Sequence, residues 1–283
     1  MAEASAPASS ANLGPGFDCL AVALEIRCVV RAAPADAWSV SHVGAAAPPA
    51  GADDAVLIAA QAAVGTSRPL ALEVDNAVPI GRGLGSSSAA AAAGAFAAWK
   101  AHGESPSLHR AWEIAAAMDG HPDNAAAAVH GGLVLATAGG AVHRLPWNVA
   151  LNAVVAVPHE PFRTTEARRL LPPVYDAAVV SRSLARVAAL VAGLVGGDAT
   201  LLADASGDEV HEQPRREARP DVAELIDVAR AAGAAHAAWS GAGPSMLALV
   251  APGGADRVRE ALERCLGDRG VVLSPGIATS GVV

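Results

Sequence analysis

The stretch PIGRGLGSSSAAAAAG at residues 79–94 constrains the fold more than any other part of this sequence. Gly81, Gly83 and Gly85 alternate through a short loop, three serines follow, and an alanine run then begins. Glycine permits positive φ angles and close approach of a ligand, while serine caps helices and alanine favours them. We therefore expect a helix that begins within Ser86–Ser88, where free backbone N–H groups and the helix dipole can hold a phosphate.

The loop does not match the two best-known phosphate-binding signatures. No Lys-Ser or Lys-Thr pair closes it, as a Walker A loop requires, and its glycines lack the spacing of the dinucleotide signature G-x-G-x-x-G. Taken alone, the loop is equally well explained as a turn that caps an alanine-rich helix, because Gly/Ser clusters are common in turns. Other parts of the chain have to decide between these two interpretations.

Length and charge limit the classes of protein to consider. With 283 residues the chain can form two domains, or one large one, and bury a substantial core. The formal net charge of −8 argues against a general binder of nucleic acid or of anionic membranes, so we expect neither among its partners. An anionic ligand would then be held by a few arginines and backbone amides.

Cysteines and apolar runs indicate the compartment. Cys19, Cys28 and Cys265 lack C-x-x-C spacing and are odd in number, which argues against a disulfide scaffold or a structural zinc site and fits a reducing compartment. The first residues lack the pattern of a signal peptide, and the apolar runs are interrupted, as by Arg186. We therefore predict no membrane span and a cytoplasmic location.

The apolar pattern predicts alternating helices and strands. Strands are expected over 20–31, near 38–43, and over 70–79, 151–157, 245–250 and 270–273, and helices over 55–64, 86–101, 107–120, 181–195, 221–232 and 254–266. The glycine-rich loop thus follows a strand and opens a helix, which is the context that a phosphate loop needs. A composition break at residues 146–162 begins a second half with a βααβαβ-like order, an α+β domain.

Polar residues gather at two further turns. Asn12 and Asp18 flank a Gly-Pro-Gly turn, where Asx-type capping explains one of them but a ligand-binding wall explains both. His121, Asp123 and Asn124 cluster at a Pro-containing helix start. Asp123 or Asn124 could simply cap that helix, yet three polar side chains within four residues favour a functional site. A metal site there lacks a third ligand at helical spacing.

Two segments of the second half carry similar signals. DEVHEQPRREARP at residues 208–220 is polar and rich in arginine, and such runs are usually solvated, charged loops. SGAGPS at residues 240–245 is a second glycine-rich turn, and it leads into a strand.

In combination, SSANLGPGFD, PIGRGLGSSSAA and SGAGPS, in this order and at these separations, resemble the three signature motifs of the GHMP small-molecule kinases. HPDN, TTEAR followed by LP, and DEVHEQPR narrow the resemblance to the homoserine kinase family. It extends from residue 7 to about residue 250. The resemblance implies an α+β, two-domain GHMP kinase fold with the active site between the domains. Residues 1–148 would form the ATP-binding domain, which is ribosomal S5 domain 2-like with a left-handed β-α-β element, and residues 149–283 a ferredoxin-like domain.

The resemblance also implies ATP-dependent phosphorylation of the side-chain hydroxyl of L-homoserine in threonine biosynthesis, with Mg²⁺, by a homodimer. The ATP phosphates would be held by the loop residues Pro79, Ile80, Gly81, Arg82, Gly83, Leu84, Gly85, Ser86, Ser87 and Ser88. Ser87, or its neighbour Ser88, would bind Mg²⁺ together with Glu113. The amino acid would be held by Asn12, Asp18, His121, Asp123, Arg168 and Arg215. A zwitterion needs a carboxylate for its ammonium group and arginines for its carboxylate, and this set supplies both.

The catalytic residues implied by the resemblance are Asn124, Arg168 and Glu113. In several related kinases an aspartate base corresponds to Asn124. An amide cannot take up a proton at neutral pH. We therefore expect catalysis without a carboxylate base, through positioning and electrostatic stabilisation, with the hydroxyl proton passing to phosphate oxygen or solvent.

The segment DEVHEQPRRE departs from the family pattern. Glu209 stands in place of an arginine, and Gln213-Pro214 replaces Pro-Tyr. These changes leave open whether Arg215 or Arg216 contacts the substrate.

Other activities are less consistent with the residues. A GHMP kinase acting on mevalonate is disfavoured by Asn124 and by two arginines suited to a carboxylate, whereas L-threonine is harder to exclude as the substrate. A catalytically idle binding protein on the same fold would be favoured by loss of Glu113 or of the serine cluster, and both are present. A Ser-His-Asp hydrolase would need a G-x-S-x-G elbow, which the sequence lacks.

Overall fold

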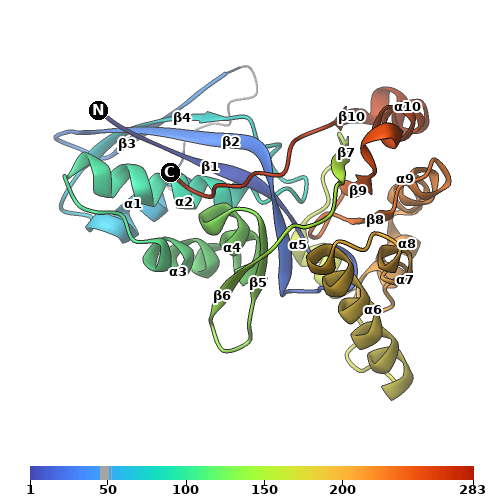
Figure 1. Cartoon of the computed structure of the whole chain (residues 1–283). Helices are drawn as coiled ribbons and strands as arrows, with labels where there is room; N and C mark the ends of the chain where they lie inside the picture. Colours follow the sequence, from blue (N-terminus) through green and yellow to red (C-terminus); the bar gives the residue numbers. More distant parts are fainter. Residues whose placement is uncertain (45–50, 52) are drawn as a thin grey trace.

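The computed structural model describes residues 1–44, 51 and 53–283, and its strands form two sheets (Figure 1). The first sheet has the order β3-β4-β2-β5-β6, with β1 paired along β2. Its strands are β1 (Ala2–Ala11), β2 (Leu20–Pro34), β3 (Ser39–Val43), β4 (Leu70–Asn76), β5 (Leu133–Ala136) and β6 (Val142–Leu145). All pairs are antiparallel except β3 with β4, which is parallel.

The described part of the first half contains the helices α1 (Ala55–Val64), α2 (Ser86–Ala101), α3 (Leu108–Asp119) and α4 (Pro122–His130). The central helix α2 packs on β1 and β2 and is flanked by the other three. Its residues from Ser88 to Trp99 are all buried, and most of them are alanines. Strand β1 is made largely of alanine and serine and is buried from Ala6 onward. Small side chains on both elements let the helix lie close to the sheet.

The second sheet is antiparallel, with the order β10-β7-β9-β8. Its strands are β7 (Asn152–Pro158), β8 (His236–Trp239), β9 (Met246–Val250) and β10 (Gly270–Leu273). Helices α9 (Pro220–Ala231) and α10 (Ala255–Leu266) pack on it, and their apolar residues form a second core with the strands. Two βαβ-type units share this sheet, as in a ferredoxin-like fold. The α+β class predicted from the sequence is confirmed.

The segment between β7 and α9 holds α5 (Thr164–Arg169), α6 (Ala177–Gly196), α7 (Leu201–Asp204) and α8 (Glu212–Ala218). The alternative interpretation of residues 208–220 as a solvated, charged loop does not hold. Asp208, His211, Glu212 and Arg215 are all buried there. A polar segment can be buried here because its side chains hydrogen-bond to one another and to backbone groups.

Helix α6 is the one helix in the described part of the chain that is long and apolar enough to cross a membrane, judged by length and composition alone. It projects away from both sheets (Figure 1). Leu190 and Leu194 at its C-terminal end are buried in the main core. Nearer its N-terminus, Arg182 and Arg186 pair with Glu209 at 2.6 and 2.8 Å. Glu209, which departs from the family pattern, thus ties this helix to the segment before α8.

The last residues of the chain return to the first half. Ile277 forms a bridge with Leu24, and the backbones of Ser5 and Val283 exchange two hydrogen bonds of 3.0 Å. Gly281 lies so close to Val129 that a Cβ atom would collide with the carbonyl oxygen of Val129. Both chain termini therefore lie on the first half (Figure 1).

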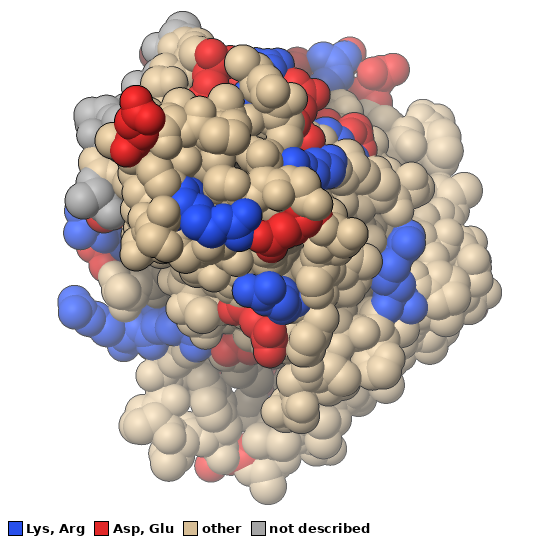
Figure 2. All heavy atoms as spheres, turned by 90° about the vertical axis from the view of Figure 1, so that its left-hand side faces the viewer, with Lys and Arg blue, Asp and Glu red and all other residues tan. Residues whose placement is uncertain are grey.

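One face of the first half is shown in Figure 2. Lysine and arginine side chains alternate there with aspartate and glutamate side chains, and no continuous basic area covers this face. This distribution is consistent with the net charge of −8.

Candidate active site

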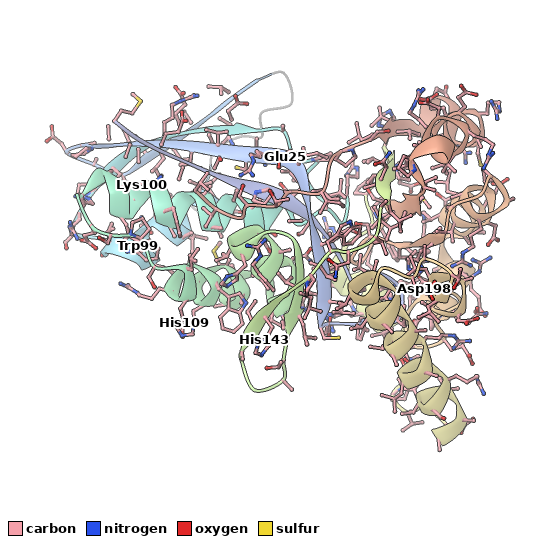
Figure 3. All side chains as sticks on the ribbon, in the orientation of Figure 1. Glu25, Trp99, Lys100, His109, His143 and Asp198 are labelled. Atoms are coloured by element: carbon pink, nitrogen blue, oxygen red, sulfur yellow. The ribbon has the colours of Figure 1, made fainter. Side chains whose placement is uncertain are left out.

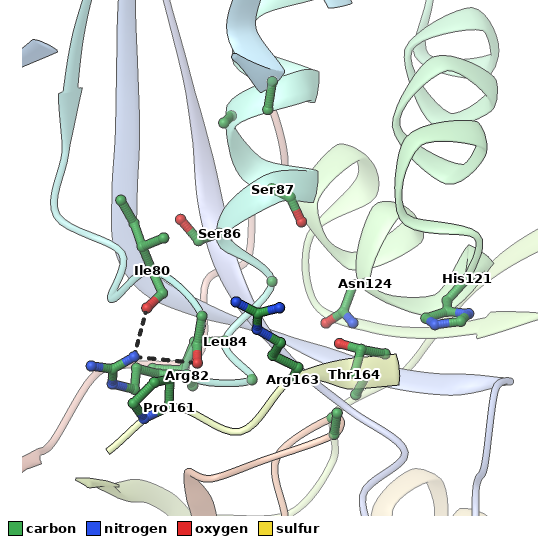
Figure 4. A pocket seen from close by; sticks show the side chains of 18 of the residues that line it. Ile80, Arg82, Leu84, Ser86, Ser87, His121, Asn124, Pro161, Arg163 and Thr164 are labelled. Atoms are coloured by element: carbon green, nitrogen blue, oxygen red, sulfur yellow. Dashed lines mark hydrogen bonds between the residues drawn. The ribbon is translucent and has the colours of Figure 1, made fainter. Parts of the chain in front are cut away.

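A cavity of about 880 Å³ lies between the two halves, and most of the predicted site residues line it (Figure 4). The lining residues among those predicted are Asn12, Asp18, Ile80, Gly81, Arg82, Gly83, Leu84, Gly85, Ser86, Ser87, His121, Asp123, Asn124, Arg168 and Arg215. Pro79, Ser88 and Glu113 are not among the lining residues. Residues more than 200 positions apart in the sequence thus meet around one space.

The glycine-rich loop adopts the conformation that its glycines suggest. Gly81, Gly83 and Gly85 have φ angles of 67°, 76° and 64°, which favour glycine. Helix α2 begins at Ser86, and Gly85 precedes it without a side-chain cap. The Nδ2 group of Asn76, at the end of β4, donates to Ser86 Oγ at 3.0 Å. This contact fixes the start of the helix relative to the strand before the loop.

The second glycine-rich turn, SGAGPS, packs directly against this loop. Ser240 Oγ donates to the carbonyl oxygen of Gly83 at 2.8 Å, and Ser245 N donates to that of Arg82 at 3.2 Å. A Cβ atom on Gly83 would collide with the carbonyl oxygen of Ser240 and lie 2.7 Å from that of Gly243. Only glycine fits here, so the contact between the two halves depends on Gly83.

Asn12 and Asp18 hold the turn after β1 in a strained conformation. Their φ angles are 70° and 57°, which non-glycine residues rarely adopt. The side chain of Asn12 accepts from Asp18 N at 3.0 Å and donates to the carbonyl oxygen of Gly241 at 3.0 Å. Such strain is often found where a side chain is fixed for ligand binding.

Arg168 connects the two polar clusters of the first half. Its Nη2 atom lies 2.7 Å from Asp18 Oδ1, and its Nε donates to His121 Nε2 at 3.1 Å. Arg168 also lies over the ring of Phe17, with Cζ 5.3 Å from the ring centroid. Helix α5 of the second half therefore contacts both Asp18 and the start of α4.

Arg215 is a buried cation without a carboxylate partner in the described chain. Its side chain donates from Nη1 to the carbonyl oxygen of Gly241 at 2.8 Å and contacts His211 Nδ1 at 2.8 Å, while its buried Nε has no partner. Burial lowers the pKa of Arg215 from 12.5 to about 10. The neighbouring Arg216 does not line the cavity and pairs instead with Asp227 at 2.6 Å.

Asp123 and Asn124 differ in their surroundings. Asp123 is 1% exposed, and burial raises the pKa of its carboxyl group to about 7. Its Oδ1 accepts from Asn124 N at 2.8 Å. Asn124 Oδ1 accepts from Ser9 Oγ at 2.8 Å, which fixes the orientation of the amide relative to β1.

The structure does not bring Glu113 to the cavity. This residue lies on α3 with a side chain that is 56% exposed, and its Oε1 is 3.4 Å from Nε2 of His109. Figure 3 shows His109 on the side of α3 that faces away from the two sheets. No group of three or more His, Cys, Asp or Glu side chains in the described part of the chain could hold a metal ion. Of the two predicted magnesium ligands, Ser87 thus lines the cavity and Glu113 does not.

Several lining residues were not identified from the sequence. Thr164 and Thr165 belong to the TTEAR segment, of which only Arg168 was assigned a role, and Arg163 directly precedes that segment. His42 and Asp54 line the cavity as a buried pair, with Nε2 and Oδ2 2.6 Å apart. Asp54 precedes an apolar helical run and caps α1, a signal that the sequence did carry.

Known proteins resemble both halves of the chain. Residues 53–132 match the family described as GHMP kinases N terminal domain, and residues 187–268 match GHMP kinases C terminal. The homoserine kinase of Deinococcus radiodurans is 38% identical over 251 residues, which cover 86% of this chain and 82% of that protein. The homoserine kinase of Desulfitobacterium hafniense is 36% identical over 277 residues, which cover 94% of this chain and 92% of that protein.

The chain belongs to the homoserine kinase family of the GHMP kinases. A crystal structure of homoserine kinase from Cytophaga hutchinsonii superposes with a TM-score of 0.88 at 26% identity, over 100% of this chain and 96% of that one. A structure of L. major mevalonate kinase has a TM-score of 0.78 at 15% identity, over 99% of this chain and 97% of that one, and shows the shared fold alone. The family and the GHMP fold predicted from the sequence are confirmed.

Proposed function

We propose that this chain transfers the γ-phosphoryl group of ATP to the side-chain hydroxyl of L-homoserine, giving O-phospho-L-homoserine for threonine biosynthesis. One observation carries the proposal: a helix-opening glycine loop and a set of groups suited to an amino-acid zwitterion line the same cavity. The relatives from Deinococcus radiodurans and Desulfitobacterium hafniense are named homoserine kinases, which supports the same substrate.

In this proposal the two ends of the cavity bind different molecules. The backbone amides of the loop and the N-terminus of α2 hold the phosphates of ATP, because free N–H groups and the helix dipole attract anions. Asp18 and Asp123 attract the ammonium group of homoserine. Arg215, with its unpartnered Nε and its buried charge, binds the carboxylate. Asn12 and His121 hold Asp18 and Arg168 in position.

Phosphoryl transfer then depends on alignment. The hydroxyl oxygen of homoserine forms a bond to the γ-phosphorus while the bond to the bridging oxygen of ADP breaks, and the hydroxyl proton passes to a phosphate oxygen or to solvent. Asn124, held by Ser9, orients the reacting groups but accepts no proton. Arg168 stabilises negative charge near the acceptor. Catalysis of this kind rests on positioning and electrostatics.

Magnesium is proposed as the ion that accompanies ATP, where it would neutralise charge on the β- and γ-phosphates. Of the predicted ligands, Ser87 lines the cavity and remains the candidate. A homodimer, a cytoplasmic location and the absence of nucleic-acid or membrane partners also remain predictions, and light scattering of the purified protein would test the first.

The test of the proposed function is ADP release from Mg-ATP with L-homoserine, L-threonine and mevalonate offered in parallel. Turnover with homoserine should exceed turnover with the other two by at least about 100-fold, because one well-placed set of polar partners discriminates by that much or more. Preferred turnover of threonine or mevalonate would contradict the substrate assignment. ATP binding without any turnover would favour an idle binding protein.

A further inference from the structure

We propose that Arg163 is a further catalytic residue, which contacts the γ-phosphoryl group during transfer. The inference rests on the proposed function and deepens it. Arg163 directly precedes α5, lines the cavity, and is exposed there. Its side chain points from the start of α5 toward the phosphate loop, into the space between Leu84 and Asn124 (Figure 4).

The segment that carries Arg163 is fixed at both ends. On one side, the carbonyl oxygen of His159 accepts from Arg82 Nη2, which ties the segment to the phosphate loop. On the other side, Arg168 binds Asp18 and His121 at 2.7 and 3.1 Å. Arg163 lies between these two anchors in the sequence. It therefore stands where the phosphate loop and the proposed amino-acid site meet, which is where the γ-phosphoryl group must pass.

The other arginines of the cavity are held by partners within the protein. Arg168 is paired with Asp18, and Arg215 contacts His211 and a carbonyl oxygen. Arg82 donates to the carbonyl oxygens of Ile80 and Gly81 at 3.1 and 3.4 Å. Arg163 is in no ion pair with any residue of the described ranges 1–44, 51 and 53–283, although it faces the cavity.

A guanidinium group at this point matches the chemistry of the step. As the oxygen–phosphorus bond to homoserine forms and the bond to ADP breaks, charge is spread over the three equatorial oxygens of the phosphoryl group. The planar, permanently charged guanidinium can donate two hydrogen bonds to these oxygens without exchanging a proton. Because it comes from the second half while the loop comes from the first, this contact requires both halves to close around ATP.

The matched variants are Arg163→Ala, Arg163→Lys and the control Arg169→Ala. Arg169 is the last residue of α5, is exposed, and does not line the cavity. With homoserine and Mg-ATP, Arg163→Ala should lower kcat by about 100-fold or more, the range seen when one transition-state donor is removed. The KM for homoserine should change by less than about threefold, because the contact is to the γ-phosphoryl group of ATP and not to homoserine. Arg163→Lys should recover part of kcat, and Arg169→Ala should match the unmodified chain.

A binding measurement separates this inference from the substrate assignment. Calorimetric titrations with ATP and with ADP, each with Mg²⁺, should show that Arg163→Ala loses its preference for ATP over ADP, while Arg169→Ala keeps it. If the unmodified chain fails to turn over homoserine, the proposed function fails. The ratio of the dissociation constants for ADP and ATP still tests the role of Arg163 in that case. An Arg163→Ala variant that keeps both kcat and the ATP preference would overturn the inference. So would a variant whose only change is a higher KM for homoserine.

Discussion

Replacing Arg215 by methionine tests whether the free protein keeps a charge buried for its substrate. Arg215 is 2% exposed and has no carboxylate partner in the described chain. Methionine has a similar length and no charge, so it can fill much of the same space. We expect Arg215→Met to weaken the binding of homoserine strongly and yet to leave the folded protein at least as stable as before.

The magnitude follows from the pKa of Arg215. A decrease from 12.5 to about 10 corresponds to about 3 kcal/mol, at about 1.4 kcal/mol for each tenfold change in proton affinity. The group is charged in the folded and in the unfolded chain at pH 7, so this cost is constant through the neutral range. Against it stand hydrogen bonds to Gly241 and His211, worth about 1 kcal/mol each. The carbonyl oxygen of Gly241 keeps Asn12 as a partner. The net change in the free energy of unfolding should be a gain of about 1 kcal/mol.

Substrate binding should change in the opposite direction. Two charge-assisted hydrogen bonds to the homoserine carboxylate are worth about 3 kcal/mol together, so KM should rise by about 100-fold or more. Urea unfolding measures stability, and coupled ADP release measures KM. Arg216→Met is the control, because Arg216 lies on the same helix, outside the cavity, and pairs with Asp227. That variant should change stability by less than about 0.5 kcal/mol and leave KM unaltered.

Two results would refute the reasoning. If Arg215→Met lost more than about 2 kcal/mol of stability, the guanidinium would be stabilised within the free protein, like one member of a buried ion pair. If Arg216→Met rather than Arg215→Met raised KM, the substrate carboxylate would bind to the other arginine.

Three further predictions concern the loop and helix α4. Gly83→Ala should lower the free energy of unfolding by about 2 kcal/mol or more and reduce kcat/KM, because the new Cβ atom collides with the carbonyl oxygen of Ser240. Gly81→Ala has no atom within 4 Å of its new Cβ atom, so it should cost only the strain of its positive φ angle, about 1 kcal/mol. Urea unfolding of both variants measures the difference. The pKa of Asp123 is raised in the folded chain, so the folded state binds its proton more tightly than the unfolded state does. The contribution of Asp123 to the free energy of unfolding should therefore fall between pH 4 and pH 7, by up to about 1.4 kcal/mol per pH unit. A matched pH series of Asp123→Asn should lack this fall. Asn124→Asp should give no increase in kcat, and a large increase would show that the reaction benefits from a carboxylate base.

The sequence predicted the elements that carry strong local signals. Helices 55–64 and 86–101 and the strand 270–273 were predicted with the bounds that the structure has. Strand β1 was missed because alanine and serine carry little strand signal, and only its burial beneath α2 makes it a strand. Strand β8 (His236–Trp239) was missed for a similar reason, since two of its four residues are alanine.

Motifs predicted much of the cavity wall, because each motif brings a short run of residues to one place. What they could not predict was the direction of individual side chains. Glu113 was expected at the cavity, but on helix α3 its side chain faces outward toward His109. Arg163 was overlooked because nothing local distinguishes it from its neighbour Arg169, and only the packing of α5 between Asp18 and the phosphate loop gives it a position.

The return of residues 277–283 to β1 and β2 has a consequence for how the molecule assembles and moves. The first half is interrupted in sequence: it lacks its final contacts until residues 146–276 have been synthesised. During translation, the backbone of β1 at Ser5 therefore stays exposed to solvent or to a chaperone until Val283 pairs with it. In the complete chain, two segments connect the second half to the first, near residues 146–151 and 274–276. Two chain crossings, rather than one, limit how far the two halves could separate in any movement that widened the cavity.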